Sequence, residues 1–167
     1  MPQNEQGTHE APFTGGCQCG AVRFSVPKLG GAAICHCRMC QKAFGGFFGP
    51  LVTGYEVTWT RGAPSWFQSS NQVRRGFCGA CGTPLAYDNG APTLEIAIGA
   101  FDDPAVAAPT KQVNPHGKQP FFDGLTALPT RPPGAAPHVD AFNAAVVSHQ
   151  HPDHDTAVWP PAQGFSA

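Results

Sequence analysis

Charged side chains are scarce in this sequence. Asp, Glu, Lys and Arg make up 13% of its 167 residues, whereas about 25% is usual for a soluble domain. The formal net charge is -1, and the only adjacent basic pair of note is Arg74 and Arg75. This composition lacks the positive surface that binds a nucleic-acid backbone or an anionic membrane. We therefore expect no nucleic acid and no membrane among the partners.

Long apolar runs are also missing. No stretch approaches the ~20 residues needed to span a bilayer. The beginning of the chain, MPQNEQGTHEAPFTGG, has neither the basic leader nor the apolar segment of a secretory signal. We therefore expect a cytoplasmic protein. Thiols stay reduced in the cytoplasm, so closely spaced cysteines indicate metal ligands or reactive groups before disulfides.

Glycine and proline are abundant, with 20 and 18 copies, which predicts short strands joined by tight turns. Apolar alternation predicts strands in AVRFSV, YEVTW and TLEIAI, and shorter strands in FFGPLV, SWFQS and QVRRGF. CRMCQKAF predicts one or two helical turns, which Gly45 and Gly46 would end. Residues 139–147 have weak helical spacing. The predicted fold class is mainly β, with small antiparallel sheets and few short helices.

The length of the chain is typical of one domain. We expect residues 1–13 to form a flexible arm and residues 14–135 to form a zinc-binding domain. Residues 136–167 are expected to form a tail, with a short helix followed by a mobile end. The oligomeric state is left open by the sequence, and a homo-oligomer is one alternative.

The seven cysteines carry the strongest pattern in the chain. Cysteine pairs that flank a tight turn can place both sulfurs near one ion, and a closed tetrahedral zinc site needs two such pairs. Flanking glycines favour the turns. The spacing predicts a structural four-thiolate site formed by Cys17, Cys19, Cys78 and Cys81.

A second group of three cysteines is one ligand short of a closed zinc site. Three protein ligands with a fourth position for water or substrate are typical of catalytic zinc. The spacing therefore predicts an open catalytic zinc site formed by Cys35, Cys37 and Cys40. Together the two groups predict two Zn²⁺ ions per chain.

Other arrangements of the cysteines remain open at this point. A histidine, either His36 or one of the tail, would close the second site. The cysteine pairs could also be combined differently between the two zinc sites. Alternatively, Cys78 and Cys81 could form a redox dithiol.

Three segments carry a family resemblance: GGCQCGAVRFSV, CHCRMCQKAFG and FCGACGTPLAY, in this order. They resemble the glutathione-dependent formaldehyde-activating enzyme family, whose domain is shared with a centromere protein. IGAFDDP and QPFFDGLTALP continue the resemblance more loosely, with Phe121 and Phe122 where a tryptophan is common in the family. The resemblance implies a zinc-stapled β-tent fold and the same assignment of structural and catalytic cysteines.

The resemblance also implies an activity, that of a carbon–sulfur lyase such as S-(hydroxymethyl)glutathione synthase. The enzyme would condense glutathione, or a similar small thiol, with formaldehyde or a related carbonyl. The thiol's carboxylates would need cations, for which the candidates near the knuckles are Arg38, Lys42, Arg74 and Arg75. The alternatives are a non-enzymatic zinc-binding module and a thiol redox sensor.

The tail contains a second metal-like pattern. His149, His151, Asp153 and His154 match the dinuclear zinc motif of metallo-β-lactamase-like hydrolases. Because that motif lies early in its own fold and needs ligands further downstream, we expect a tail that caps the domain or is mobile.

Overall fold

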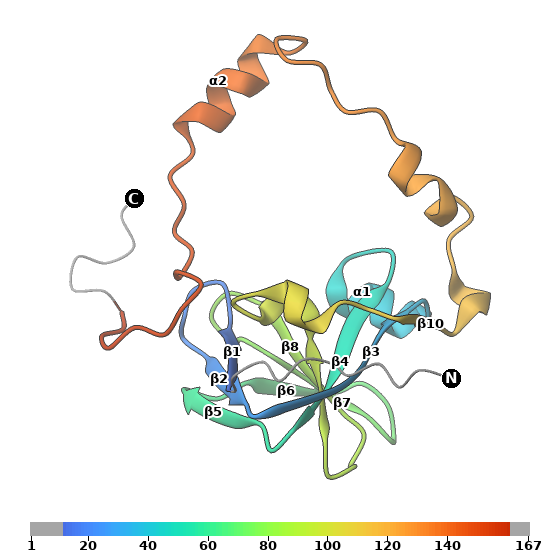
Figure 1. Cartoon of the computed structure of the whole chain (residues 1–167), viewed down its shortest axis with the longest axis vertical. Helices are drawn as coiled ribbons and strands as arrows, with labels where there is room; N and C mark the ends of the chain where they lie inside the picture. Colours follow the sequence, from blue (N-terminus) through green and yellow to red (C-terminus); the bar gives the residue numbers. More distant parts are fainter. Residues whose placement is uncertain (1–11, 161–167) are drawn as a thin grey trace, which may run out of the picture.

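A computed structural model describes residues 12–160, and the protein is mainly β, as the sequence predicted (Figure 1). Residues 1–11, which make up most of the expected arm, lie outside the described residues, as do residues 161–167. The strands in chain order are β1 (Phe13–Gly16), β2 (Arg23–Val26), β3 (Lys28–Cys35), β4 (Gly49–Tyr55), β5 (Thr58–Arg61), β6 (Ser65–Gln68), β7 (Arg74–Phe77), β8 (Pro84–Asp88), β9 (Leu94–Ala97) and β10 (Lys111–Val113).

The strands form two sheets. The smaller sheet has three strands in the order β1-β2-β5, and the larger has seven in the order β10-β3-β4-β9-β8-β7-β6. All neighbours are antiparallel except β10 and β3, which run parallel. The expected antiparallel sheets are therefore present, and one parallel pair is added at an edge.

Helices contribute little to the part of the chain described. They are α1 (Arg38–Phe44), α2 (Pro137–Ala145) and the short 3-10 helices η1 (Ile98–Ala100), η2 (Pro104–Ala107), η3 (Pro115–Gly117) and η4 (Phe122–Ala127). α1 ends at Gly45, whose φ of 61° is left-handed, so the predicted stop signal is confirmed. Within residues 12–160, no helix is long and apolar enough to cross a bilayer.

Two predicted strands are shorter than expected. YEVTW is divided, because Glu56 adopts a left-handed φ of 53° that ends β4 and turns the chain into β5. TLEIAI forms β9 only as far as Ala97, and Ile98 begins η1 instead. The helix expected at residues 139–147 begins two residues earlier, with Pro137 in its first turn, where a missing N–H costs nothing.

One apolar core joins the two sheets. It includes Val26 of β2 together with Val52 and Ile96 of the larger sheet, all nearly inaccessible to solvent. At its centre, Phe24 is fully buried and meets the ring of Phe101 edge to face, at 5.2 Å between centroids. Burial of a phenylalanine contributes roughly 1.5–3 kcal/mol, so this packing helps to hold the two sheets together.

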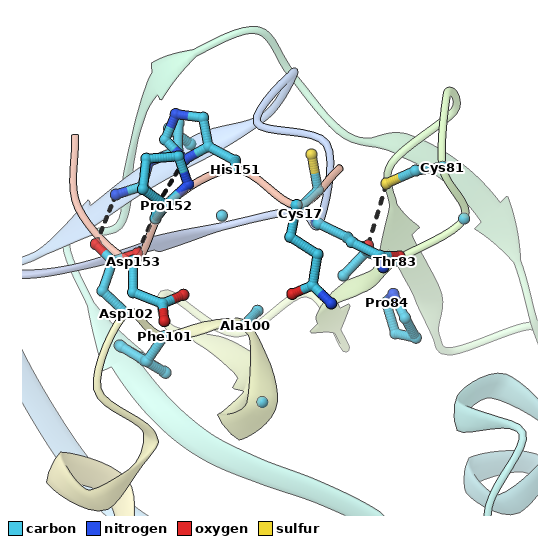
Figure 2. A pocket seen from close by; sticks show the side chains of 16 residues that line it. Cys17, Cys81, Thr83, Pro84, Ala100, Phe101, Asp102, His151, Pro152 and Asp153 are labelled. Carbon is cyan, nitrogen blue, oxygen red and sulfur yellow. Dashed lines mark hydrogen bonds and ion pairs between the residues drawn. The ribbon is translucent and has the colours of Figure 1, made fainter. Parts of the chain in front are cut away.

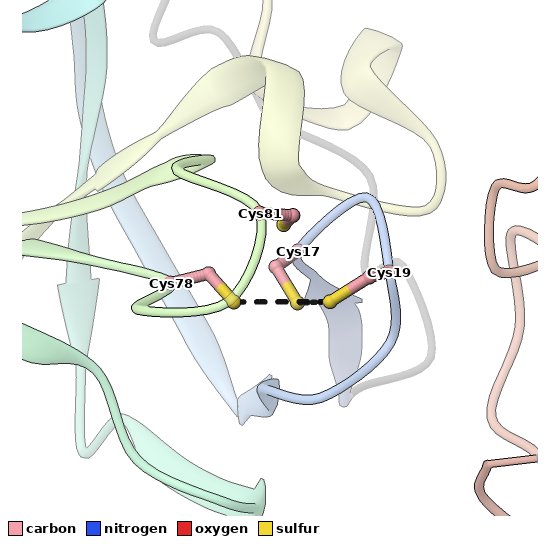
Figure 3. Close-up of side chains that lie close together, drawn as sticks. All are labelled: Cys17, Cys19, Cys78 and Cys81. Atoms are coloured by element: carbon pink, nitrogen blue, oxygen red, sulfur yellow. Dashed lines mark hydrogen bonds between the residues drawn. The ribbon is translucent and has the colours of Figure 1, made fainter.

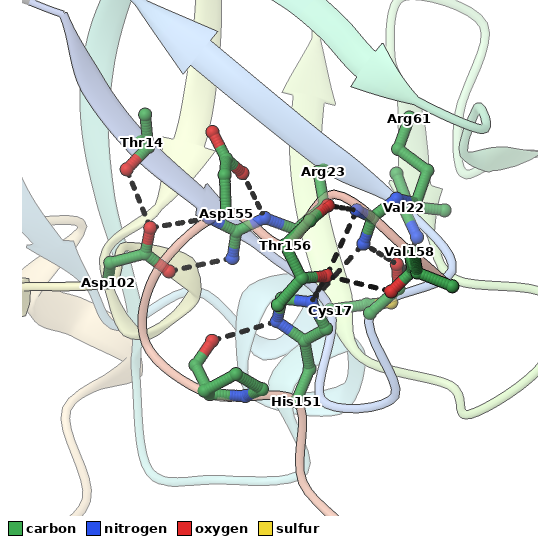
Figure 4. A network of polar contacts seen from close by, with 12 residues as sticks. Thr14, Cys17, Val22, Arg23, Arg61, Asp102, His151, Asp155, Thr156 and Val158 are labelled. Carbon is green, nitrogen blue, oxygen red and sulfur yellow. Dashed lines mark hydrogen bonds and ion pairs between the residues drawn. The ribbon is translucent and has the colours of Figure 1, made fainter. Parts of the chain in front are cut away.

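The C-terminal segment returns to the smaller sheet after a wide arc through η3, η4 and α2 (Figure 1). One of its contacts with the sheet is a network of ion pairs (Figure 4). The buried guanidinium of Arg23 donates from Nε to Asp155 at 2.7 Å and from its terminal nitrogens to Asp102 at 2.6 and 2.7 Å. Thr14 donates to the same Asp102 carboxylate at 2.6 Å. A buried cation is tolerated only when paired in this way.

Further contacts hold residues 150–159 over the loop between β1 and β2. The indole N–H of Trp159 donates to the carbonyl of Cys19 at 2.7 Å, and the amide of His151 donates to the carbonyl of Gln18 at 2.7 Å. Arg61 donates to the carbonyl of Thr156. We call residues 150–159 the C-terminal strap.

Asp102 gives this network a pH dependence. Burial raises the pKa of the Asp102 carboxyl, but the Arg23 guanidinium and the Thr14 hydroxyl outweigh burial and bring the pKa below its ordinary value. The stabilisation is therefore complete above the unfolded-state pKa of about 3.9. It is lost as the pH falls through the lower folded-state pKa.

We predict that Asp102→Asn lowers the free energy of unfolding by about 3 kcal/mol at pH 7, because it leaves the buried Arg23 cation short of one carboxylate. The difference from wild type should shrink as the pH falls towards 3. Urea unfolding of both proteins across this range measures it. Asp123→Asn is the control: it removes an exposed ion pair with Lys118, which is worth less than about 1 kcal/mol. A difference that does not change with pH would contradict the prediction.

Candidate functional site

Four cysteine sulfurs from two distant loops meet beside the smaller sheet (Figure 3). They belong to Cys17, Cys19, Cys78 and Cys81, and all lie within 4.8 Å of one another. We call them the four-cysteine cluster. The first pair lies in the loop between β1 and β2, and the second lies in the turn between β7 and β8. The cluster therefore joins the beginning of the domain to its middle.

The spacing of these sulfurs fits a metal ion better than a disulfide. Cys19 Sγ lies 3.6 Å from Cys17 Sγ and 3.8 Å from Cys78 Sγ, whereas a disulfide needs about 2.05 Å. Zn–S bonds of ~2.3 Å place two sulfurs of a tetrahedron roughly 3.8 Å apart. The donor set and its geometry thus suit a Zn²⁺ ion held by four thiolates.

The thiols of this cluster have divergent pKa values without a metal. Burial raises the pKa of Cys19 to about 12. Burial also acts to raise the pKa of Cys81, but the hydroxyl and backbone of Thr83 outweigh it and lower that pKa to about 6. A bound metal ion deprotonates coordinating thiols outright. Its positive charge would also offset the electrostatic cost of placing four thiolates close together.

The other three cysteines form a second cluster at the edge of α1. Cys35 ends β3, Cys37 is the N-cap residue of α1, and Cys40 lies in the first turn of the helix. Their sulfurs lie within 4.8 Å of one another, and no histidine or carboxylate of residues 12–160 joins them. We call them the cysteine triplet.

His36 faces away from the triplet, although it lies between two of its members in sequence. Its ring is fully buried, with Nε2 2.9 Å from the side-chain oxygen of Gln112 and an edge-to-face contact with Phe122 at 4.7 Å. Its Nδ1 has no hydrogen-bond partner among the described residues. His36 therefore packs in the wall behind the triplet and is not a fourth ligand in this geometry.

Two side chains from other elements donate to the sulfurs of the triplet. Asn114 Nδ2 lies 3.1 Å from Cys35 Sγ, and Arg75 donates to Cys40 Sγ at 3.5 Å. Burial raises the pKa of Cys35, but the Cys37 backbone and Asn114 outweigh it, so the pKa is lowered overall. Burial raises the pKa of Cys40 to about 12 against the effect of Arg75. Both donors act to stabilise a thiolate, and at Cys35 the hydrogen bonds together exceed the effect of burial.

The triplet lines a cavity of about 450 Å³, a volume within the usual range for small-molecule sites. The cavity lies on the face of the larger sheet opposite the core. Besides the triplet, its polar lining residues are Thr53, Arg75, Tyr87, Glu95, Lys111 and Asn114. Burial raises the pKa of Tyr87, so its hydroxyl stays protonated and can donate a hydrogen bond.

A second cavity of about 370 Å³ lies between the four-cysteine cluster and the C-terminal strap (Figure 2). Cys81 and Thr83 lie on one side, with Asp102 and the strap residue His151 on the other. Its buried charges already pair with one another through Arg23. The thiols in its wall, those of Cys17 and Cys81, belong to the four-cysteine cluster.

The histidine motif of the tail does not gather a metal-ligand cluster within residues 12–160. His151 instead packs against Gly20, and its Nε2 lies 3.0 Å from the hydroxyl of Thr156 and 3.2 Å from a guanidinium nitrogen of Arg61. This histidine serves the docking of the strap.

Of the four cations proposed from the sequence to bind the thiol's carboxylates, one lines the cavity of the triplet and three do not. Arg75 lines the cavity of the triplet, whereas Arg38 donates to Gln41, Arg74 pairs with Asp88, and Lys42 is exposed on α1. Sequence reasoning did not find the other polar lining residues. The alternation in TLEIAI does place Glu95 on the face opposite Ile96, but nothing in the sequence shows that this face borders a cavity.

Two comparisons show what this chain is similar to. A family model described as "Glutathione-dependent formaldehyde-activating enzyme" matches residues 12–116. A solved structure of a Rhodobacter sphaeroides protein is similar over 60% of this chain and 100% of its own, with a TM-score of 0.50 and 21% sequence identity. At that identity the likeness supports the fold alone.

We predict that the two clusters respond differently to loss of one ligand. Cys81→Ser and Cys37→Ser should each reduce bound zinc from two ions per chain to one. Only Cys81→Ser should lower the melting temperature strongly, by at least ~10 °C, because structural metal binding contributes directly to folding free energy. Elemental analysis and thermal unfolding measure both effects. Two zinc ions in either variant, or equal thermal losses, would refute the assignment.

Proposed function

Because the chain belongs to the glutathione-dependent formaldehyde-activating enzyme family over residues 12–116, we propose that it is a zinc-dependent carbon–sulfur lyase-type enzyme. It joins a small thiol such as glutathione to formaldehyde or a related carbonyl compound. The triplet Cys35, Cys37 and Cys40 holds the catalytic zinc, and the four-cysteine cluster holds a structural zinc.

One observation carries this proposal above the others. Three sulfurs converge within 4.8 Å at the wall of a cavity of about 450 Å³, and no fourth protein ligand among residues 12–160 joins them. Three protein ligands at a cavity are typical of catalytic zinc, and four are typical of structural zinc. The two clusters of one chain thus favour two different roles.

The chain's own residues prepare the triplet for this chemistry. A zinc ion held there would keep a substrate thiol deprotonated near neutral pH and could polarise a carbonyl group. Three thiolates favour a soft sulfur ligand. Asn114 and Arg75 donate to Cys35 and Cys40, which orients these sulfurs and spreads their negative charge.

The proposed reaction needs no oxidant or reductant. The substrate sulfur forms a bond to the carbonyl carbon, the carbon–oxygen π bond breaks, and the thiol proton ends on the new hydroxyl group. The Tyr87 hydroxyl lines the same cavity and is a suitable hydrogen-bond donor to the carbonyl oxygen. The product is a hydroxymethyl thioether when the carbonyl compound is formaldehyde.

We predict that the protein accelerates exchange between free glutathione and its formaldehyde adduct, as measured by two-dimensional exchange NMR. Cys37→Ser should reduce the acceleration by more than ~100-fold, because loss of a ligand exceeds the 10- to 100-fold effect of losing a residue that supports one. Lys42→Gln, an exposed change on the same helix, should leave it unaltered. No acceleration by the zinc-loaded wild type would refute the activity.

The same preparations distinguish a thiol redox sensor. A sensor would form a reversible disulfide within the triplet under mild peroxide and would not accelerate the exchange. Mass spectrometry of the peptide that contains residues 35–40 detects this product.

A further inference from the structure

The register of the larger sheet lines the cavity of the triplet with charges of both signs. Thr53 of β4 pairs with Glu95 of β9, Glu95 pairs with Tyr87 of β8, and Tyr87 pairs with Arg75 of β7. Directly paired residues share one face of a sheet. On the far edge, Lys111 of β10 pairs with Ala33 of β3, and both line the same cavity.

Glu95 lies in the middle of this row without a cation. Its Oε1 accepts a hydrogen bond from the Thr53 hydroxyl at 2.8 Å, and its side chain is half-buried. None of the ion pairs within residues 12–160 includes it. A half-buried carboxylate is more stable with an opposite charge beside it, so the cavity has a place for a positively charged group of a ligand.

Lys111 provides the opposite charge at the edge of the same cavity. Its ammonium lies above Gly31, 3.7 Å from where a Cβ atom on that residue would stand. It has no carboxylate partner among the described residues. Arg75 is less available for a ligand, because it already donates to Cys40 and Ser69 and lies over the Tyr87 ring.

We propose that Glu95 and Lys111 determine the specificity of this cavity, selecting thiols that carry both an ammonium and a carboxylate group. Glu95 pairs with the ammonium, Lys111 pairs with the carboxylate, and the sulfur points to the triplet. This inference rests on the proposed function, since it assumes that the triplet cavity accepts a thiol. It assigns to two residues the recognition of the charges that such a thiol carries.

The test uses four small thiols that differ in whether they carry the ammonium, the carboxylate, both or neither. Cysteine has both groups, cysteamine has only the ammonium, 3-mercaptopropionate has only the carboxylate, and 2-mercaptoethanol has neither. Binding of each to the zinc-loaded full chain is measured by titration calorimetry, with zinc content checked after each titration. Wild type should bind cysteine most tightly.

The variants then identify which residue recognises which group. Glu95→Gln should weaken cysteine and cysteamine by about fivefold, the value of a partly exposed ion pair, and spare the other two thiols. Lys111→Gln should weaken cysteine and 3-mercaptopropionate by a similar factor and spare the others. Glu56→Gln and Lys42→Gln change exposed charges outside the cavity, and they should leave all four affinities unchanged.

The outcomes separate this inference from the proposed function. Equal losses for all four thiols, no losses, or no binding of cysteine to wild type would overturn the selection. If the expected binding pattern appears without faster adduct exchange, the selection stands and the lyase activity fails. If exchange is accelerated equally for 3-mercaptopropionate and 2-mercaptoethanol, in wild type and in Lys111→Gln, the activity stands and the selection fails.

Discussion

The alternation of side chains along the strands of the larger sheet governs both the stability and the site of this protein. Residues two apart share a face, so Val52 and Ile96 point into the apolar core while their neighbours Thr53 and Glu95 line the triplet cavity. A shift of one residue in any strand would exchange these sets. The buried packing around Phe24 therefore also fixes the positions of the polar residues on the opposite face. The strand register thus determines both which residues form the core and which line the cavity.

Local patterns were enough to predict the cysteine groups. Cysteine pairs two or three residues apart meet through their own turns, as in the knuckle of Cys78 and Cys81, where Gly82 has a φ of 79°. The end of α1 could also be predicted from a local signal, because Gly45 adopts the left-handed conformation that caps the helix. The strands that were not predicted lack such signals. β3, with the sequence KLGGAAIC, has little β propensity, and it is a strand because β4 pairs along it.

The cavity could not be predicted from the sequence because its residues come from six separate strands, from α1 and from the residue that follows β10. Asn114, Lys111 and Arg75 approach the triplet from positions up to 79 residues away in the chain, as the Asn114–Cys35 contact shows. The histidine motif of the tail is the reverse case, because it was correctly not assigned as a metal site. Its spacing fits a dinuclear site, yet the neighbours of His151 are Thr156 and Arg61. A motif implies metal binding only where the fold brings the remaining ligands to it.

The C-terminal strap also imposes an order of events during synthesis. Its residues 150–159, including the Trp159 that bonds to Cys19, lie well beyond Cys81, the last sulfur of the four-cysteine cluster. A ribosome adds about 5–20 residues per second, so all four sulfurs leave it several seconds before their cover is made. The two cysteine pairs are therefore open to solvent, and to any metal ion in it, until the strap docks over the loop between β1 and β2.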